Sequence, residues 1–582
     1  MEDIVDVSGT SDTQPISGLL QHRSLFQKAW PYAVIAVICL LAGFYGCELN
    51  RQLYLKQSPF YDSLSYNDKL YKVMKIANAD GLGEALHWSC FVQSTNCLPY
   101  MLASFLGPFM EPTRMIGVWI QSALLFGFLT SLFYYLERIR GLPKGLSLFG
   151  ILGFLTTKCL FLHNGGLSDF RMDLSLYLTY ATTACWFLSA IERPRYRYFF
   201  LLGFFASIAC LFRATAPVYL ILGMFPILVI EMIRSRFIKQ VLIGTCFSIL
   251  IVILSTGWFY FYNFEYLKYY YVVWNTDANA KIPLADAMQH FGLVHRSLGS
   301  AATLLMLLWS VTNLVIAIQQ KTWVSWIKDS IREKDWDWRI AWIGLAPVLF
   351  LVLRRAGLNG LVSMPAVFGF LLFFLLPILL QANRMPNSFV QRYLAVGLAT
   401  CLTVATVRGW QRHTEIDNRS FEVHTSLIET IILDSQNTGS HQANFGVLHL
   451  SDLNTDTLFS TLAFDIEADH RELYAVTVDG VRMSPIPTFM LPAKADWDGV
   501  EGETNQQKIA NLLDHCNRLM DYLIVPDASS AAHLSETLSF NYINRFVGLI
   551  RGNIVSDPQW ARIATGIRTG QNEVVDIYKR LR

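Results

Sequence analysis

The stretch Ser58–Tyr71, SPFYDSLSYNDKLY, follows the first strongly apolar segment and places one carboxylate, Asp62, among aromatic and small hydroxyl residues. A second acidic cluster, Asp169–Asp173 (DFRMD), lies further along at the edge of another apolar segment. Ionisable residues in or beside membrane-spanning segments are costly and often functional. The side of the membrane on which each cluster lies therefore decides whether both can act on one substrate.

Composition indicates a polytopic membrane protein. Of the 582 residues, 53% are hydrophobic and 16% are charged, whereas soluble proteins carry about 25% charged residues. Apolar runs of roughly 20 residues recur, which is the length of a helix that crosses a hydrocarbon core of about 30 Å. Met1–Ser24 lacks the basic start and cleavage site of a signal peptide, so the first apolar segment is expected to be retained. The net charge of +2 carries no information about nucleic acid, but the sequence has no basic face with interleaved aromatic residues, so no nucleic-acid partner is expected.

The apolar pattern predicts eleven transmembrane spans. They are 29–47, 115–135, 145–163, 172–191, 198–212, 216–233, 240–262, 298–318, 340–354, 360–381 and 391–408.

Basic residues in short loops set the orientation, because they collect on the cytoplasmic side. With the N-terminus inside, every cytoplasmic loop is basic. These loops hold Arg138, Arg140 and Lys144; Arg193, Arg195 and Arg197; Arg234, Arg236 and Lys239; Lys321, Lys328, Arg332 and Lys334; and Arg384 and Arg392. We therefore predict a cytoplasmic tail over 1–28, a membrane domain over 29–408 and an external domain over 409–582. Asp62 and DFRMD then share the external side, in a plasma membrane that is expected to be a bacterial inner membrane facing a periplasm.

The external loop 48–114 is expected to lie against the membrane. Apolar residues recur at helical spacing over 64–79, which predicts an amphipathic helix in the interface. The apolar stretch 85–109 is interrupted by prolines, so either half is too short to span and a second interfacial or re-entrant element is expected. Cys90 and Cys97 share this loop and can form a disulfide in an oxidising compartment, although spacing alone does not establish the geometry.

Beyond residue 409 the composition becomes that of a soluble domain. Helices are predicted over 419–436, 455–468, 506–520 and 530–552, and strands over 445–450, 473–478, 522–526 and 573–579. Strands that alternate with helices predict a small α/β domain with a largely parallel sheet.

The acidic residues have structural as well as catalytic interpretations. Asp62 can cap a helix or a turn. Asp169 can be the N-cap of the fourth span, and Asp173 can complement its dipole. If the helix includes both residues they share one face, with Arg171 on another, and Asp173 then needs a partner because it lies deeper in the apolar segment.

Basic residues at the external boundaries form a third group. Arg213 ends the fifth span in CLFRATAP, and Arg354 and Arg355 end the ninth. Loop 263–297 adds Lys281, His290, His295 and Arg296. Each alone can extend to lipid headgroups. Beside carboxylates they fit a lipid with a phosphate head, because arginine binds phosphate oxygens in pairs.

Four features together resemble the GT-C superfamily of membrane glycosyltransferases, in the branch of protein O-mannosyltransferases and aminoarabinose transferases. They are Asp62 in PFYDSLSY, the amphipathic elements of the same loop, DFRMD at the fourth span, and LGFFASIACLFRATAP over Leu202–Pro217. The resemblance covers about residues 30–400. It implies transfer of a sugar from a polyprenyl-phosphate or pyrophosphate carrier to a glycan, lipid or protein acceptor outside the membrane.

The resemblance also implies roles for residues. Asp62 would be the general base in an inverting attack, and Asp169 and Asp173 would position the acceptor, orient the partners of Asp62 or hold a divalent ion such as Mg²⁺ or Mn²⁺. The candidates for binding the donor phosphate are Arg171, Arg213, Arg296 and Arg354. Ser63 follows Asp62 where many relatives have a second acid, which leaves the metal open.

Two other classes of function remain on sequence grounds. A transporter or flippase for a lipid or polyanion also needs outward charges, but typically shows broken or charged helices at mid-bilayer. A membrane scaffold that presents the C-terminal domain needs none of the acidic residues.

Overall fold

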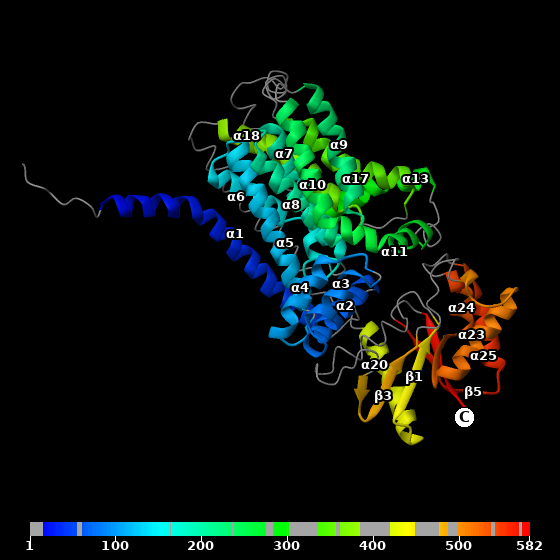
Figure 1. The fold of residues 1–582 in the computed structure, drawn as a ribbon. Helices are drawn as coiled ribbons and strands as arrows, with labels where there is room; N and C mark the ends of the chain where they lie inside the picture. Colours follow the sequence, from blue (N-terminus) through cyan, green and yellow to red (C-terminus); the bar gives the residue numbers. More distant parts are fainter. Residues whose placement is uncertain are drawn as a thin grey trace, which may run out of the picture.

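The computed structural model describes most of the chain. The described residues are 16–54, 61–92, 94–113, 115–162, 165–234, 238–274, 283–299, 301, 336–356, 361–384, 419–448, 476–486, 497–536, 542–569 and 573–581. Within them, a bundle of long helices precedes an α/β domain (Figure 1).

Long apolar helices form the bundle. They are α1 (Ile16–Tyr54), α5 (Met115–Tyr134), α6 (Lys144–Leu155), α7 (Met172–Glu192), α8 (Tyr196–Phe212), α9 (Ala216–Arg234), α10 (Ile238–Tyr262), α17 (Trp338–Arg354) and α18 (Pro365–Arg384). In the described part of the chain, five regions are long and apolar enough to cross a membrane: Ala29–Asn50, Met115–Ile139, Met172–Glu192, Ala216–Arg234 and Ile238–Tyr262. Nine of the eleven predicted spans overlap one of these helices. The segment 391–408, and all but the first residues of 298–318, lie outside the described residues.

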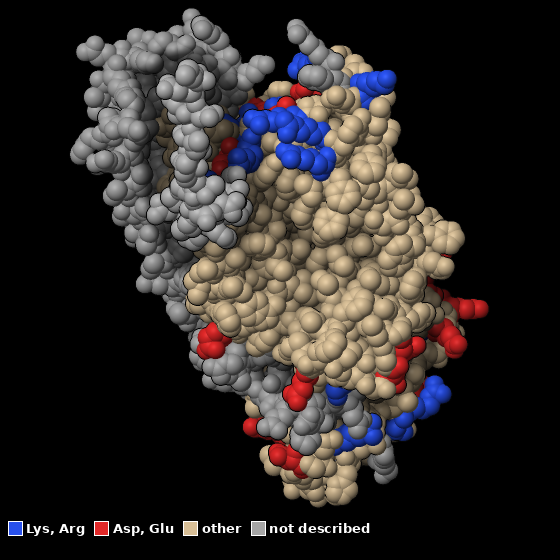
Figure 2. All heavy atoms as spheres, turned by 60° about the vertical axis from the view of Figure 1, so that its left-hand side comes forward, with Lys and Arg blue, Asp and Glu red and all other residues tan. Residues whose placement is uncertain are grey.

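Helix α7 is the centre of the bundle. Every residue from Met172 to Ile191 is buried, and the helix packs against α5, α8, α9 and α18. Helix α10 lies at the periphery, since Ile253 and Leu254 are 59% and 71% exposed. Apolar side chains exposed to this extent fit a lipid environment. Figure 2 shows one face of the molecule, which has a broad central band without charged residues.

Close helix packing depends on small residues at one contact. Gly344 of α17 faces Gly369 of α18, and a Cβ added at Gly344 would lie 2.7 Å from the backbone nitrogen of Phe370. Small residues let two helix backbones approach in this way inside membranes.

The loop between α1 and α5 folds into short helices, α2 (Tyr61–Ala79), α3 (Leu82–Cys90) and α4 (Leu98–Leu106), followed by the 3₁₀ turn η1 (Gly107–Phe109). The predicted helix over 64–79 is present as α2, and its location in the membrane interface stays a prediction. Leu70, Val73 and Met74 are fully buried, in a cluster with residues of α4, α5 and the start of α7. Exposed apolar side chains of this loop occur on α4, where Phe105 is 47% exposed.

Smaller elements connect the long helices. They are the π-helical turns η2 (Tyr135–Ile139) and η4 (Tyr269–Trp274), the 3₁₀ turn η3 (Lys158–Phe161), and the helices α11 (Phe264–Lys268), α13 (Leu284–Ala287) and α14 (His290–Leu298). The prediction of a span over 145–163 was wrong in its length, because α6 ends at Leu155 and η3 follows it.

The C-terminal domain contains a six-stranded mixed sheet in the order β2-β3-β1-β4-β6-β5. Its elements are α20 (Arg419–Asn437), β1 (Gln442–Val447), β2 (Val476–Val478), β3 (Val481–Pro485), α23 (Asn505–Leu519), β4 (Tyr522–Pro526), α24 (Ala528–Glu536), η7 (Tyr542–Phe546), α25 (Val547–Ser556), β5 (Trp560–Arg568) and β6 (Val574–Arg580). In Figure 1 the domain lies towards the same end of the bundle as α2, α3 and α4.

Three predictions for this domain need correction. The sheet is not largely parallel, because only the β1–β3 and β1–β4 pairs are parallel, whereas β2–β3, β4–β6 and β5–β6 are antiparallel. The helix predicted over 530–552 is divided into α24 and α25, and the strands β3 and β5 were missed. The helix predicted over 455–468 lies outside the described residues.

Candidate functional site

Asp173 lies in the first turn of α7 and is 3% exposed. The helix begins at Met172, so Asp169 precedes it and does not share a helical face with Asp173, contrary to the prediction. Arg171 is the N-cap residue in an extended conformation, with φ −133° and ψ 136°. Its Nε lies 3.2 Å from Asp173 Oδ2, so the arginine that was predicted to point away is an ion-pair partner.

Asp169 fixes the turn that precedes α7 rather than capping the helix. Its Oδ2 accepts a hydrogen bond of 2.7 Å from the backbone N–H of Gly165, which has a φ of +89°. Asn50 of α1 donates to the Ser168 carbonyl over 2.6 Å. These contacts hold the turn against α1.

Helix α5 holds the same turn from a second side. The Gln121 amide donates to the carbonyls of Asp169 and Arg171 over 3.3 and 3.1 Å. A Cβ at Gly117 would overlap the Phe170 ring, so a glycine is needed at this close approach. The DFRMD segment is therefore a rigid support for Asp173.

Arg213 meets Asp173 from helix α8. As the residue that ends α8, it has an extended backbone. Its Nη1 donates to the Tyr66 hydroxyl over 2.6 Å, and its Nη2 lies 3.4 Å from Asp173 Oδ1. Its Nε is buried and finds no hydrogen-bond acceptor in the described part of the chain. We refer to Tyr66, Arg171, Asp173 and Arg213 as the Asp173 cluster.

Lys69 adds a cation that sequence reasoning missed. Its Nζ donates to Ser94 Oγ over 3.2 Å and lies 4.8 Å from the centre of the Tyr100 ring. Burial, with a smaller effect of the charge of Lys72, lowers the pKa of Lys69 to about 8. The available signal was spacing, because Lys69 follows Tyr66 by three residues on α2 and so lies on the same helical face.

Asp62 is the second residue of α2. Helical geometry places position 62 one turn before Tyr66 on the same face, next to the residue that contacts Arg213. The side chain of Asp62 lies outside the described part of the chain.

The two remaining candidate arginines lie in different places. Arg354, the last residue of α17, is exposed and donates to the Tyr271 carbonyl over 3.4 Å. Arg296 is exposed on α14, whose main contacts are with η3, α17 and α18. Arg354 thus contacts η4, and the structure gives Arg296 no contact with the Asp173 cluster in the described residues.

A second buried charge cluster lies at the other end of α7. Glu192 accepts a hydrogen bond from Tyr135 over 2.9 Å, and it pairs with Arg140 and Arg339 at 3.1 and 3.3 Å. Asp337 pairs with the same two arginines. We refer to these five residues as the Glu192 cluster.

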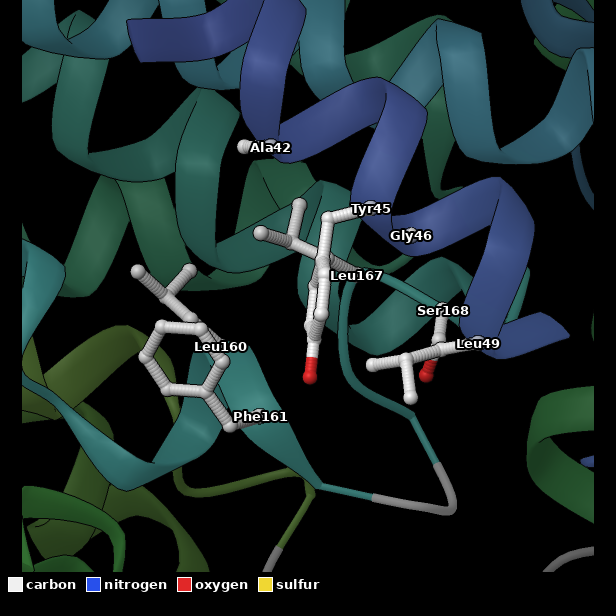
Figure 3. Close-up of a pocket in the computed structure, with 8 residues that line it drawn as sticks. All are labelled: Ala42, Tyr45, Gly46, Leu49, Leu160, Phe161, Leu167 and Ser168. Carbon is white, nitrogen blue, oxygen red and sulfur yellow. The ribbon is translucent and has the colours of Figure 1, made fainter. Parts of the chain in front are cut away.

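A small cavity lies beside the DFRMD support, between α1, η3 and the turn before α7 (Figure 3). Its lining is Ala42, Tyr45, Gly46, Leu49, Leu160, Phe161, Leu167 and Ser168. The volume is about 10 Å³, which holds little more than one water molecule. This cavity is too small to be the substrate pocket.

The carboxylates do not form a recognisable metal centre. No group of three potential ligands among His, Cys, Asp and Glu occurs in the described residues. Both oxygens of Asp173 face guanidinium groups, and one oxygen of Asp169 is used by Gly165. This arrangement does not fit the carboxylate-rich sites that Mg²⁺ and Mn²⁺ prefer.

Comparison with known proteins identifies the fold. The sequence matches no family and no curated protein among those compared. The structure is similar to ArnT from Cupriavidus metallidurans bound to undecaprenyl phosphate, with a TM-score of 0.50 and 11% identity over 94% of this chain and 97% of that one. The apo state of the same protein gives a TM-score of 0.52 and 10% identity over 95% and 98%. The chain therefore shares its fold with ArnT, in agreement with the GT-C fold that the resemblance in the sequence implied.

Proposed function

We propose that this protein transfers a sugar from a polyprenyl-phosphate-type carrier to an acceptor on the external face of the membrane, with inversion at the anomeric carbon. The observation that carries the proposal is the environment of Arg213. Its guanidinium group is held by Tyr66 and Asp173 and keeps a buried N–H without an acceptor among the described residues. Such a group is suited to a phosphate oxygen.

A disulfide independently supports the proposed orientation of the protein in the membrane. Cys90 and Cys97 are bonded, in the loop that was predicted to be external. Disulfides persist in oxidising compartments such as the periplasm. The C-terminal domain lies towards the same end of the bundle as this loop, which fits an external location for both (Figure 1).

The donor phosphate would be bound by Arg213 and Lys69, with Arg354 further out. When the bond between the anomeric carbon and the phosphate oxygen breaks, negative charge grows on the leaving phosphate. Fixed cations in a site shielded from water stabilise that charge without reorganisation. Arg171 and Asp173 act as positioning residues, because they hold Arg213 in place.

The acceptor would lose its proton to Asp62. The carboxylate takes the proton of an acceptor hydroxyl or amine as the acceptor oxygen or nitrogen attacks the anomeric carbon. Attack on the face opposite the leaving phosphate gives inversion. General-base assistance of this kind contributes about 10²–10⁴-fold to the rate. Asp169 maintains the turn beneath the site, and no step requires a metal ion.

The experiment is a transfer assay with purified protein in nanodiscs and a panel of polyprenyl-phosphate sugars. We expect Asp62→Asn to lower kcat by about 10²–10⁴-fold while carrier binding persists. Asp68→Asn is the matched control, because position 68 lies on another face of α2. Full activity of Asp62→Asn would exclude Asp62 as the base. Movement of labelled carrier across vesicles with no cleavage of the sugar–phosphate bond would favour a flippase instead.

A further inference from the structure

The disulfide Cys90–Cys97 closes a short loop beside the proposed phosphate-binding cations. Helix α3 ends at Cys90, and Cys97 is the N-cap residue of α4. Both cysteines are buried, in a cluster with Phe259 and Leu267. Gln93 lies outside the described residues, so the inference rests on the disulfide and on the segment Ser94–Cys97.

The segment is hydrogen-bonded to the chain on both sides of Arg213. The Cys97 N–H donates to the Leu211 carbonyl over 2.8 Å, and the Ala214 N–H donates to the Thr95 carbonyl over 3.1 Å. Leu211 belongs to the last turn of α8, where carbonyls lack partners within the helix. The loop therefore completes the end of α8 and fixes the backbone from which Arg213 extends.

The same segment contacts Lys69. Ser94 is fully buried, and its hydroxyl accepts the hydrogen bond from Lys69 Nζ. Asn263, at the end of α10, accepts from the Ser94 N–H over 3.1 Å and donates to the Cys90 carbonyl over 2.7 Å. One loop thus joins both cations to the end of α10.

We propose that the disulfide-closed loop Cys90–Cys97 positions Arg213 and Lys69 for the carrier phosphate, so that tight carrier binding requires the oxidised form. This inference rests on the proposed function. An open loop has more conformations than a closed one, because the bond removes chain entropy. Reduction is expected to let the Ser94–Cys97 segment move, and with it both cations.

The test is carrier binding and kinetics in nanodiscs before and after reduction with a dithiol reagent. The reagent becomes a cyclic disulfide as Cys90 and Cys97 become two thiols, so electrons and protons balance. We expect KM for the sugar carrier, and Kd for polyprenyl phosphate, to rise by about 10- to 10²-fold, with kcat changed less than about twofold. Reoxidation with a soluble disulfide should restore both values.

The double variant Cys90→Ser/Cys97→Ser should match the reduced protein and no longer respond to the reagent. Cys246→Ser, at an exposed cysteine on α10, is the control and should respond like the wild type. Asn263→Ala should raise KM in the oxidised protein while the disulfide remains. If the double variant does not fold, reduction and reoxidation of the wild type still give the answer.

The outcomes distinguish a failure of the loop's positioning role from a failure of the proposed function. If oxidised protein binds polyprenyl phosphate and Arg213→Gln weakens that binding, but reduction has no effect on KM, the loop does not position the cations. If reduction lowers both kcat and thermal stability but leaves KM unchanged, the inference is also overturned, because the disulfide then has only a structural role. If oxidised protein does not bind polyprenyl phosphate, the proposed function fails and the inference fails with it.

Discussion

Helix α7 carries a buried charge cluster at each end, and the two are built differently. In the Glu192 cluster, two carboxylates meet two arginines, and each acid contacts both of them. In the Asp173 cluster, one carboxylate faces two arginines at 3.2 and 3.4 Å, and Arg213 keeps a buried N–H without an acceptor in the described structure. The first arrangement is closed, whereas the second has room for another acceptor.

The two clusters are far apart along α7. Asp173 and Glu192 are 19 helical residues apart, which corresponds to about 28 Å along the axis. That is close to the thickness of a hydrocarbon core, about 30 Å. The two clusters are therefore separated by about the thickness of a hydrocarbon core. A closed network ties the helices together, and an open one is available to a ligand.

The difference between the two clusters predicts that the largest loss of stability follows from a change in the Glu192 cluster. Glu192→Gln leaves Arg140 and Arg339 with one carboxylate between them, and breaking a buried ion network in this way costs about 3–5 kcal/mol. We expect a loss of that size in the free energy of unfolding, measured by chemical denaturation in detergent micelles, with kcat of the folded fraction unchanged.

Arg138→Gln is the matched control for this change. Its ion pair with Glu137 is 51% exposed on the arginine side, and exposed pairs contribute about 0–1 kcal/mol. If Glu192→Gln lowers the free energy of unfolding no more than Arg138→Gln does, the Glu192 cluster does not stabilise the helix bundle.

The open cluster is expected to respond in activity rather than stability. Arg213→Gln removes a cation from the leaving phosphate, and the loss of one such group lowers kcat/KM by about 10²–10³-fold. The free energy of unfolding should fall less than in Glu192→Gln, because Asp173 keeps Arg171. Steady-state transfer kinetics beside a denaturation curve measure both quantities.

Arg296→Gln sharpens the same comparison. The family resemblance made Arg296 a candidate for binding the phosphate, but Arg296 is exposed on α14. We expect a change in kcat/KM below about threefold, within the range usual for exposed residues. A loss as large as that of Arg213→Gln would place Arg296 in the site and contradict the geometry described above.

The sequence predicted those parts of the structure that depend on local pattern. Apolar length located α7 within one residue, and helical spacing located α2. Loop charge placed Asp62 and DFRMD on one side, and this reasoning stays a prediction. Where a helix begins was harder to predict. The start of α7 at Met172 rather than near Asp169 reversed the direction expected for Arg171.

Contacts between distant segments could not be predicted. Arg140 donates a hydrogen bond to Asp337 although 197 residues separate the two in the sequence. No local periodicity of the sequence predicts such a contact. The environment of Lys69 likewise depends on the packing of α2 against α4, which brings its side chain next to Tyr100. Strand β5 was missed because its pairing with β6 is irregular near Gly566, which has a φ of +74°.

The smallest effect concerns the pH dependence of Lys69. Its pKa of about 8 lies below the usual 10.5, so Lys69 loses its charge as the pH rises through 8. A bound phosphate favours the charged form, and carrier affinity should therefore fall by up to about tenfold per pH unit above 8. The Lys69 contribution to stability has the opposite sign. Between pH 8 and 10.5 the unfolded state binds more protons at this residue, so that contribution rises with pH.

Lys69→Arg tests the expected pH dependence of carrier binding, because arginine stays charged throughout this range. In the wild type, 1/KM for the carrier should fall above pH 8, whereas in Lys69→Arg it should stay level to about pH 10. Lys75→Arg on the same helix should keep the wild-type profile. Parallel profiles for the wild type and Lys69→Arg would mean that Lys69 does not contact the phosphate, and Arg213 would then be the principal cation of the open cluster.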